Sequence, residues 1–170
     1  MDSLEYFLNK YDLVMPRFNH APAISCAEYS RLNLNLPGVQ TKNLFLRDKK
    51  GRQHFLVAVP YDIEVNLIAL SSSLGVGRLG MASAERLKHF LKVAPGSVSV
   101  LSLFVDVDKQ VKLIIDESLW KANAIQAHPM INTETVIITQ SNLIRFLKVT
   151  GHEPKILSVP TKADMENYSS

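Results

Sequence analysis

The chain has 170 residues, 46% of them hydrophobic and 21% charged, and its formal net charge at pH 7 is +3. This length accommodates one domain with a core of its own, so it needs no disulfide support. The mild positive charge fits an ordinary solvated surface as well as contact with a polyanion such as RNA, so charge alone selects neither.

The single cysteine, Cys26, excludes an internal disulfide and a metal site built from several cysteines. We interpret it as a packed thiol, because it stands where a helix is expected to open. The first residues are acidic and lack the basic end and apolar core of a signal peptide. No apolar run approaches the ~20 residues that a membrane span requires. We therefore expect a soluble, cytoplasmic protein with no membrane association.

The N-terminal part of the chain predicts two helices and a loop. The first helix is expected over residues 3–11, with Ser3 as its N-cap and an apolar stripe on one face. Residues 16–22 are expected to form a loop, and Ser25 to cap a short second helix. A turn at Pro37-Gly38 then leads into a hairpin.

That hairpin is the clearest local pattern in the chain. The apolar run Leu44-Phe45-Leu46 suits a buried strand, and Asp48-Lys49-Lys50-Gly51 supplies the turn. The run His54-Phe55-Leu56-Val57 completes a return strand that ends near Pro60.

The middle of the chain predicts two further helices. One covers residues 65–74, with Asp62 as its cap and Gly75 at its end. The other begins at Ser83. Residues 98–107 are apolar and fit either a strand or a short helical turn.

The remaining elements mix strands and helices. Strands are predicted at 111–115, 136–139 and 156–159, with a short turn or helix at 117–120 and a helix from Ser141 to about residue 150. The predicted fold class is therefore α/β (α+β), with a mixed β-sheet core flanked by helices. We expect a single domain over residues 1–160 and a polar, flexible tail over residues 161–170.

Three residues have side chains or backbone suited to ligand binding. Lys42 and Asn43 stand together at the start of the first hairpin strand. A lysine offers a point charge for phosphate, and an asparagine offers both a donor and an acceptor. Gly96 lacks a Cβ, so backbone N–H groups beside it can approach a carbonyl oxygen that becomes negative during hydrolysis. A plain turn is the alternative interpretation of Gly96.

Two histidines stand near prolines, His128 directly before Pro129 and His20 two residues before Pro22. Each fits a structural role or a catalytic one. No His–Glu pair has the spacing of a zinc site, and no Gly-x-Ser-x-Gly elbow occurs. A hydrolase with this sequence is therefore expected to use a positioned water, with no metal and no covalent intermediate.

The run Gly75-Val76-Gly77-Arg78-Leu79-Gly80 superficially fits the glycine fingerprint of dinucleotide sites. That fingerprint requires a strand before the glycines, whereas a helix is predicted there. We expect a loop instead, from which Arg78 reaches phosphate, and no cofactor.

Three segments occur in a fixed order: Thr41-Lys42-Asn43-Leu44-Phe45-Leu46, then Pro95-Gly96-Ser97-Val98-Ser99, then His128-Pro129 followed by Asn132-Thr133-Glu134-Thr135. With the upstream His20-x-Pro22, this order resembles the YbaK/ProX-type aminoacyl-tRNA deacylases. Among them it most resembles the free-standing alanyl-tRNA(Pro) deacylases, known as ProXp-ala or the PrdX group. The resemblance spans about residues 4–159.

The resemblance implies a trans-editing hydrolase that deacylates mischarged Ala-tRNA(Pro) by attack of water on the ester. Such editing is needed because a synthetic site built for proline excludes a smaller side chain only weakly. The resemblance also implies that the single domain is an editing domain, similar to the one inserted in many bacterial prolyl-tRNA synthetases.

The same resemblance implies roles for four residues. Lys42 would bind the phosphate or sugar end of the terminal adenosine, and Asn43 would hold the edge of the ribose. Gly96 would line the aminoacyl pocket, and His128 would position the ester or the water. Pocket volume would then exclude the larger proline.

The expected partner is tRNA, with prolyl-tRNA synthetase and elongation factor as further candidates. A basic rim for the acceptor stem is expected on exposed turns, at Lys49, Lys50, Arg52 and Arg78. The same residues also suit an ordinary solvated surface. Two alternative functions stay open: deacylation of a tRNA mischarged with cysteine, serine or 2-aminobutyrate, and a non-catalytic module that binds tRNA or a synthetase.

Overall fold

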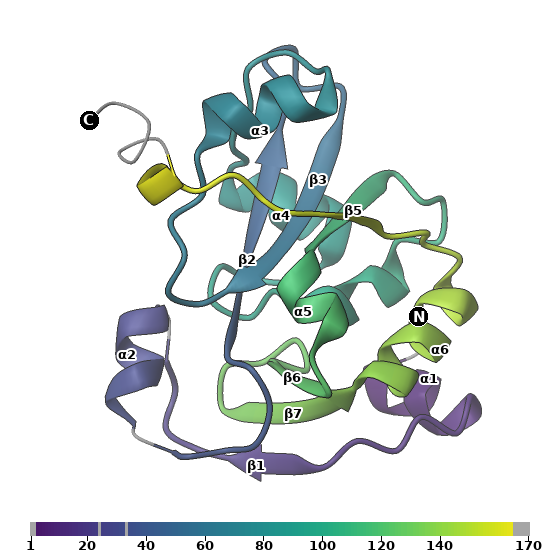
Figure 1. Cartoon of the computed structure of the whole chain (residues 1–170). Coiled ribbons are helices and arrows are strands. Elements are labelled where there is room, and N and C mark those ends of the chain that lie inside the picture. The colour runs from purple at the N-terminus through teal and green to yellow at the C-terminus, as the bar shows by residue number, and fades with distance from the viewer. Residues whose placement is uncertain (1–2, 24, 33, 165–170) are drawn as a thin grey trace.

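The computed structural model describes residues 3–23, 25–32 and 34–164, which form two sheets flanked by helices (Figure 1). The helices are α1 (Leu4–Lys10), α2 (Cys26–Arg31), α3 (Leu67–Leu74), α4 (Ala84–Leu91), η1 (Val100–Val105), α5 (Glu117–Lys121) and α6 (Gln140–Thr150). The strands are β1 (Arg17–Asn19), β2 (Thr41–Arg47), β3 (His54–Pro60), β4 (Gly80–Met81), β5 (Val111–Asp116), β6 (Ala124–Ala127), β7 (Glu134–Thr139) and β8 (Lys155–Leu157). The predicted α/β class is confirmed.

The larger sheet has five strands in the order β4-β2-β3-β5-β8. Strand β2 pairs antiparallel with β3 and β4, whereas the β3–β5 and β5–β8 pairs are parallel. The predicted hairpin is confirmed, with Arg47 opposite His54 next to the turn. The central strand β3 is buried from His54 to Val59, because apolar cores cover both of its faces.

The smaller sheet is antiparallel, with the order β1-β7-β6, and it meets the larger sheet just before β2. Val39 forms a parallel bridge with β6, and the Thr41 hydroxyl donates a 2.7 Å hydrogen bond to the Gln126 carbonyl. Gly38 permits this approach, because its φ is +86° and a Cβ would lie 3.3 Å from the Ala124 backbone. The start of β2 therefore lies at the junction of the two sheets.

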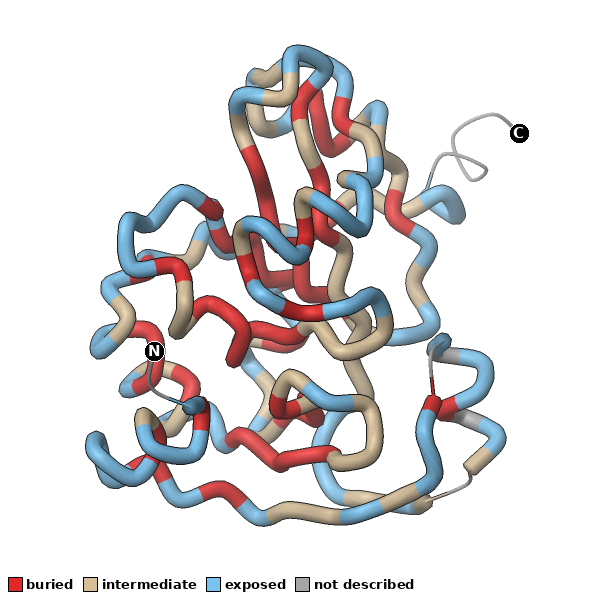
Figure 2. Tube along the Cα trace, turned by 180° about the vertical axis from the view of Figure 1, so that it is seen from behind, coloured by how far each residue is buried: buried red, intermediate tan, exposed pale blue. Residues whose placement is uncertain are grey.

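Two apolar cores lie on opposite faces of the larger sheet. The main core packs against α1, α4, η1 and α6 and contains Phe45 and Phe146, whereas the second core contains Leu46 of β2 and Leu70 of α3. Phe45 and Leu46 enter different cores because side chains alternate along a strand. Each fully buried side chain of this kind contributes roughly 1.5–3 kcal/mol. Figure 2 shows the buried positions gathered in the interior and the exposed ones along the connecting loops.

The strands at both ends of the smaller sheet were not predicted. Residues 16–22, expected as a loop, contain β1, because Arg17–Asn19 pair with a strand more than a hundred positions later. The apolar segment 98–107 contains the 3₁₀ helix η1, so the helical alternative for it is confirmed.

The predicted caps of α1 and α4 are confirmed, and two other caps are corrected. Asn66, not Asp62, caps α3, and Thr139, not Ser141, caps α6. In both helices the capping side chain stands directly before the first helical residue, where its oxygen reaches the N–H three positions on. Asp62 is too early for that contact, and Ser141 already lies inside α6.

The chain after β8 runs back past α3. Thr161 forms an antiparallel bridge with Val65, and the Lys162 N–H donates to the Glu64 carbonyl. Residues 165–170, the rest of the expected tail, lie outside the described residues, as does the side chain of Cys26. Within the described ranges, no helix combines the length and apolarity that crossing a bilayer requires.

Candidate active site

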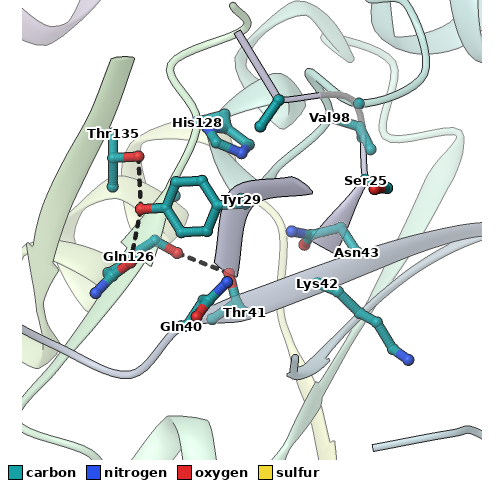
Figure 3. Close-up of a pocket in the computed structure, with 13 residues that line it drawn as sticks. Ser25, Tyr29, Gln40, Thr41, Lys42, Asn43, Val98, Gln126, His128 and Thr135 are labelled. Atoms are coloured by element: carbon teal, nitrogen blue, oxygen red, sulfur yellow. Dashed lines mark hydrogen bonds between the residues drawn. The ribbon is translucent and has the colours of Figure 1, made fainter. Parts of the chain in front are cut away.

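A cavity of about 140 Å³ lies at the junction of the two sheets (Figure 3). Lys42, Asn43, Gly96 and His128 all line it. The rest of its lining is mostly small or polar: Ala23, Ser25, Tyr29, Gln40, Thr41, Val98, Gln126, Ala127 and Thr135. The fold thus brings the four site residues expected from the sequence into one cavity.

Lys42 and Asn43 leave β2 in different directions, as neighbours on a strand do. Figure 3 shows the Asn43 amide pointing toward the side of the pocket where Tyr29 lies, and Lys42 extending outward, away from Tyr29. The Asn43 Oδ1 atom is buried and has no hydrogen-bond partner among the described residues. A buried acceptor in this state costs about 1–3 kcal/mol, and a hydroxyl or amino group of a ligand would satisfy it.

Ser99 holds the loop before η1 against the loop after β6. Its hydroxyl donates to the His128 carbonyl at 2.6 Å and accepts from the Leu101 N–H at 3.2 Å. The Ser102 hydroxyl completes a capping box by accepting from the Ser99 N–H. Gly96, in the same loop, has a φ of +89°, which favours glycine. These hydrogen bonds hold the loop beside His128.

The His128 ring has a defined tautomer. Its Nδ1 lies 3.0 Å from the Glu134 carbonyl, which only accepts, so Nδ1 carries the proton and Nε2 of the neutral ring is an acceptor. Burial lowers the pKa of His128 below its ordinary 6.5, although the bond to Glu134 acts in the opposite direction. The ring is therefore neutral near pH 7 and can accept a proton.

A hydrogen-bonded group of side chains behind the cavity was not predicted from the sequence. The Tyr29 hydroxyl lies 2.8 Å from Gln126 Oε1 and 2.9 Å from Thr135 Oγ1, as the dashed lines in Figure 3 mark. The Thr135 hydroxyl in turn lies 2.8 Å from His20 Nε2. His20 does not line the cavity itself but contacts a residue that does. No sequence spacing indicates this group, because its members come from four separate segments.

A second, open groove lies at the tip of the β2–β3 hairpin and is lined by Arg47, Lys49, Lys50, Gly51, Met81, Ser83 and Arg86. Within the described residues, its four cations have no carboxylate partner. Arg52 and Arg78, also expected at a basic rim, do not line this groove. The loop that carries Arg78 nevertheless passes beside the tip, because Gly77 lies near Lys49.

The chemistry of the cavity follows from three groups. They are the neutral imidazole of His128, the unpartnered oxygen of Asn43 and the cation of Lys42. Such a set suits an anionic ligand with hydroxyl or amino donors and a bond that water can cleave. In the described part of the chain, no three His, Cys, Asp or Glu residues are grouped to hold a metal ion.

A family model of the aminoacyl-tRNA editing domain matches residues 20–146, which is most of the chain. The chain belongs to the aminoacyl-tRNA editing domain family. Editing is hydrolysis of the ester that joins an amino acid to tRNA, so this editing domain is an aminoacyl-tRNA deacylase.

Two curated relatives match nearly the whole editing domain. Prolyl-tRNA synthetase associated domain-containing protein 1 of Danio rerio is 39% identical over 157 residues, covering 91% of this chain and 85% of that protein. Prolyl-tRNA editing protein ProX of Acetoanaerobium sticklandii is 30% identical over 162 residues, covering 94% and 99%. The crystal structure of a candidate trans-editing enzyme for prolyl tRNA synthetase has the same fold, with a TM-score of 0.68, 18% identity and coverage of 92% and 94%.

Proposed function

We propose that this editing domain deacylates Ala-tRNA(Pro) in trans, releasing alanine and uncharged tRNA. The observation that carries the proposal is that Lys42, Asn43, Gly96 and His128 line one cavity in a chain of the editing-domain family. The bacterial relative is named a prolyl-tRNA editing protein, which supports the choice of tRNA.

Three of these residues hold the substrate. Lys42, which extends outward, attracts a phosphate of the terminal adenosine. Asn43 accepts a hydrogen bond from a ribose hydroxyl at its unpartnered Oδ1. Backbone N–H groups beside Gly96 stabilise the ester carbonyl oxygen as negative charge develops on it.

His128 acts on the water. Its Nε2 accepts a proton while the water oxygen bonds to the carbonyl carbon. The ester C–O bond then breaks, and the ribose oxygen takes the proton back from His128 to become a hydroxyl. The step needs the neutral imidazole at its start, which agrees with the lowered pKa of His128.

The small cavity supports alanine as the acyl group. A volume of about 140 Å³ has to hold the acyl group together with the attacking water. A pyrrolidine ring competes with that water for space, so proline is rejected by steric exclusion rather than by a lost contact.

The hairpin-tip groove gives the tRNA a basic surface beyond the cavity. Its four cations suit acceptor-arm phosphates. Strand β2 has seven residues and spans roughly 20 Å, so one acceptor arm can reach from Lys42 to Lys50. The name of the Danio rerio relative supports prolyl-tRNA synthetase as a further partner.

Parallel assays with Ala-tRNA(Pro), Pro-tRNA(Pro) and Ala-tRNA(Ala) test the proposal. We expect rapid release of amino acid from Ala-tRNA(Pro) alone. Equal hydrolysis of Pro-tRNA(Pro) would overturn steric exclusion. The panel also includes tRNAs mischarged with cysteine, serine or 2-aminobutyrate. Faster release from one of these would identify it as the substrate in place of Ala-tRNA(Pro). Binding of tRNA without release of any amino acid would favour a non-catalytic module.

A further inference from the structure

A second cavity, of about 340 Å³, adjoins the active-site cavity and shares part of its wall. Tyr29, Gln40 and Gln126 line both cavities. The residues that line the second cavity and not the first are Leu34, Asn35, Leu36, Gly38 and Tyr61. We call it the Tyr61 cavity. Its volume falls within the range of about 300–1,000 Å³ that is usual for small-molecule sites, so the two cavities can hold two parts of one ligand.

The buried side chain of Gln126 separates the two cavities. Its Nε2 donates to the three backbone carbonyls of residues 36–38, each at 3.2 Å, and its Oε1 accepts from the Tyr29 hydroxyl at 2.8 Å. The three carbonyls belong to the loop that forms one wall of the Tyr61 cavity. The wall between the cavities is therefore shaped by hydrogen bonds within the protein.

Tyr61 is placed by the open end of the β2–β3 hairpin. Its N–H donates to the Gln40 carbonyl at 3.0 Å, which continues the pairing one residue beyond Thr41 and Pro60. Residues opposite one another in an antiparallel pair project from the same face, as do residues two apart on one strand. Because Lys42 lies opposite Val59, Tyr61 is its diagonal neighbour, roughly 7–8 Å away. The hairpin thus places an aromatic ring and a cation on one face beside the active-site cavity.

The Tyr61 cavity combines the surfaces that a nucleobase requires. Tyr61 is 41% exposed, so one base can stack on its ring. Leu34 and Leu36 add apolar surface to the lining. The Asn35 amide offers a donor and an acceptor, and amide side chains pair in this way with the polar edge of adenine. A flat group with apolar faces and a polar edge therefore fits this cavity.

We propose that the Tyr61 cavity binds the adenine of the terminal adenosine of tRNA, stacked on the Tyr61 ring. This inference rests on the proposed function, which places the ester in the active-site cavity and a phosphate beside Lys42. A volume of about 140 Å³ already has to hold the acyl group and the attacking water, so the base lies outside it. The adjoining cavity receives the base of the same nucleotide. Because every mature tRNA ends in adenosine, the contact adds affinity without selecting among tRNAs.

Binding of uncharged tRNA(Pro) tests this site without any hydrolysis. The probe carries 2-aminopurine, a fluorescent isomer of adenine that is quenched by stacking, in place of its terminal adenine. We expect the native chain and Tyr61→Phe to quench the emission and to bind with the same Kd. Tyr61→Ala should quench less and raise the Kd by at least about fivefold, the effect of one lost base–aromatic stack. Native quenching or a native Kd in Tyr61→Ala would overturn the proposal.

Tyr6→Ala is the matched control, because Tyr6 is exposed on α1 and lines neither cavity. It should bind the probe as the native chain does, and a loss equal to that of Tyr61→Ala would overturn the proposal.

A tRNA(Pro) whose terminal ribose carries no base completes a double-mutant cycle. Tyr61→Ala should cost no further affinity for this tRNA, because the stacking partner is already gone. A fivefold loss there would assign Tyr61 to another part of the tRNA and overturn the proposal. Absence of Ala-tRNA(Pro) hydrolysis by the native chain would overturn the proposed function and leave these binding results intact.

Discussion

The Ser99 hydroxyl donates a 2.6 Å hydrogen bond to the backbone carbonyl of His128, across 29 positions of sequence. The bond joins the loop that carries Gly96 to the loop that carries the imidazole. Because Ser99 is fully buried, water does not replace the bond when it is removed. The relative position of the two loops therefore depends on one side chain that does not line the cavity.

Ser99→Ala should lower the free energy of unfolding by about 1–3 kcal/mol, because it leaves buried polar groups without a partner. It should also lower kcat for deacylation by at least about tenfold, because His128 and the Gly96 loop lose their fixed separation. Urea unfolding and single-turnover hydrolysis measure the two effects. Ser97→Ala is the matched control, and an equal loss of kcat there would contradict the argument.

Asn43→Leu should stabilise the chain and inactivate it. The substitution removes a buried acceptor that has no partner, so the free energy of unfolding should rise by about 1 kcal/mol or more. Deacylation should fall by about 100-fold, because the ribose hydroxyl loses its acceptor and is left unpaired. Unfolding and hydrolysis are measured on the same preparation. A destabilised variant would show that the Asn43 oxygen has a partner in solution.

Lys42→Ala should lower kcat/KM by about 100-fold or more, because a phosphate loses its charged partner. The fold should stay intact, since the Lys42 side chain extends outward from β2 and forms no ion pair with the other described residues. Lys112→Ala, on β5 and outside the cavity, is the control. Full activity of Lys42→Ala would remove this residue from the mechanism.

Acid should destabilise the chain through two histidines. Burial lowers the pKa of both His128 and His54 below the ordinary 6.5, with Arg86 adding to the effect on His54. Below pH 6.5 these two histidines bind more protons in the unfolded chain than in the folded chain. Their contribution to stability therefore falls as pH drops from 6.5 toward the folded pKa values, and it is level above 6.5. Urea unfolding at pH 7.5 and 5.5 measures this difference, which should shrink in His54→Gln. Equal stability at both pH values would contradict it.

The hairpin-tip groove should contribute to affinity and its salt dependence. Lys49 and Lys50 are exposed, and replacing both by alanine should raise KM for tRNA and reduce the slope of log KM against log salt by about 2. The kcat value should change little, because neither residue lines the cavity. The control replaces Lys148 and Lys155 by alanine, which removes the same amount of charge outside the groove. An unchanged salt slope in the groove variant would exclude phosphate contact there.

The hairpin could be predicted because its determinants are local. Asp48 closes the turn by accepting from the N–H groups of Arg52 and Gln53, all within five residues, and these bonds lower its pKa. An apolar run on each side of such a turn leaves one pairing register. Lys42 and Asn43 could be placed at the start of a strand for the same reason.

The parts that could not be predicted depend on distant partners. Strand β1 has three residues and exists because β7 offers it an edge. The links of Tyr29 to Gln126 and Thr135 span about a hundred positions, and an isolated tyrosine or glutamine carries no sign of such a bond. Local patterns thus predict elements, whereas the polar wall of the cavity is set by tertiary contacts.

Figure 1 shows α2 set apart from both sheets, although Tyr29 from this helix lines the cavity together with residues of β2. The proposed reactive groups belong to strands and loops, whereas Tyr29 belongs to a peripheral six-residue helix. The Tyr29 ring nevertheless lies 5.4 Å from the ring of His128, so a substitution of Tyr29 changes the lining of the pocket and the packing of the imidazole together. Substrate preference and chemistry are therefore coupled through this small helix during evolution.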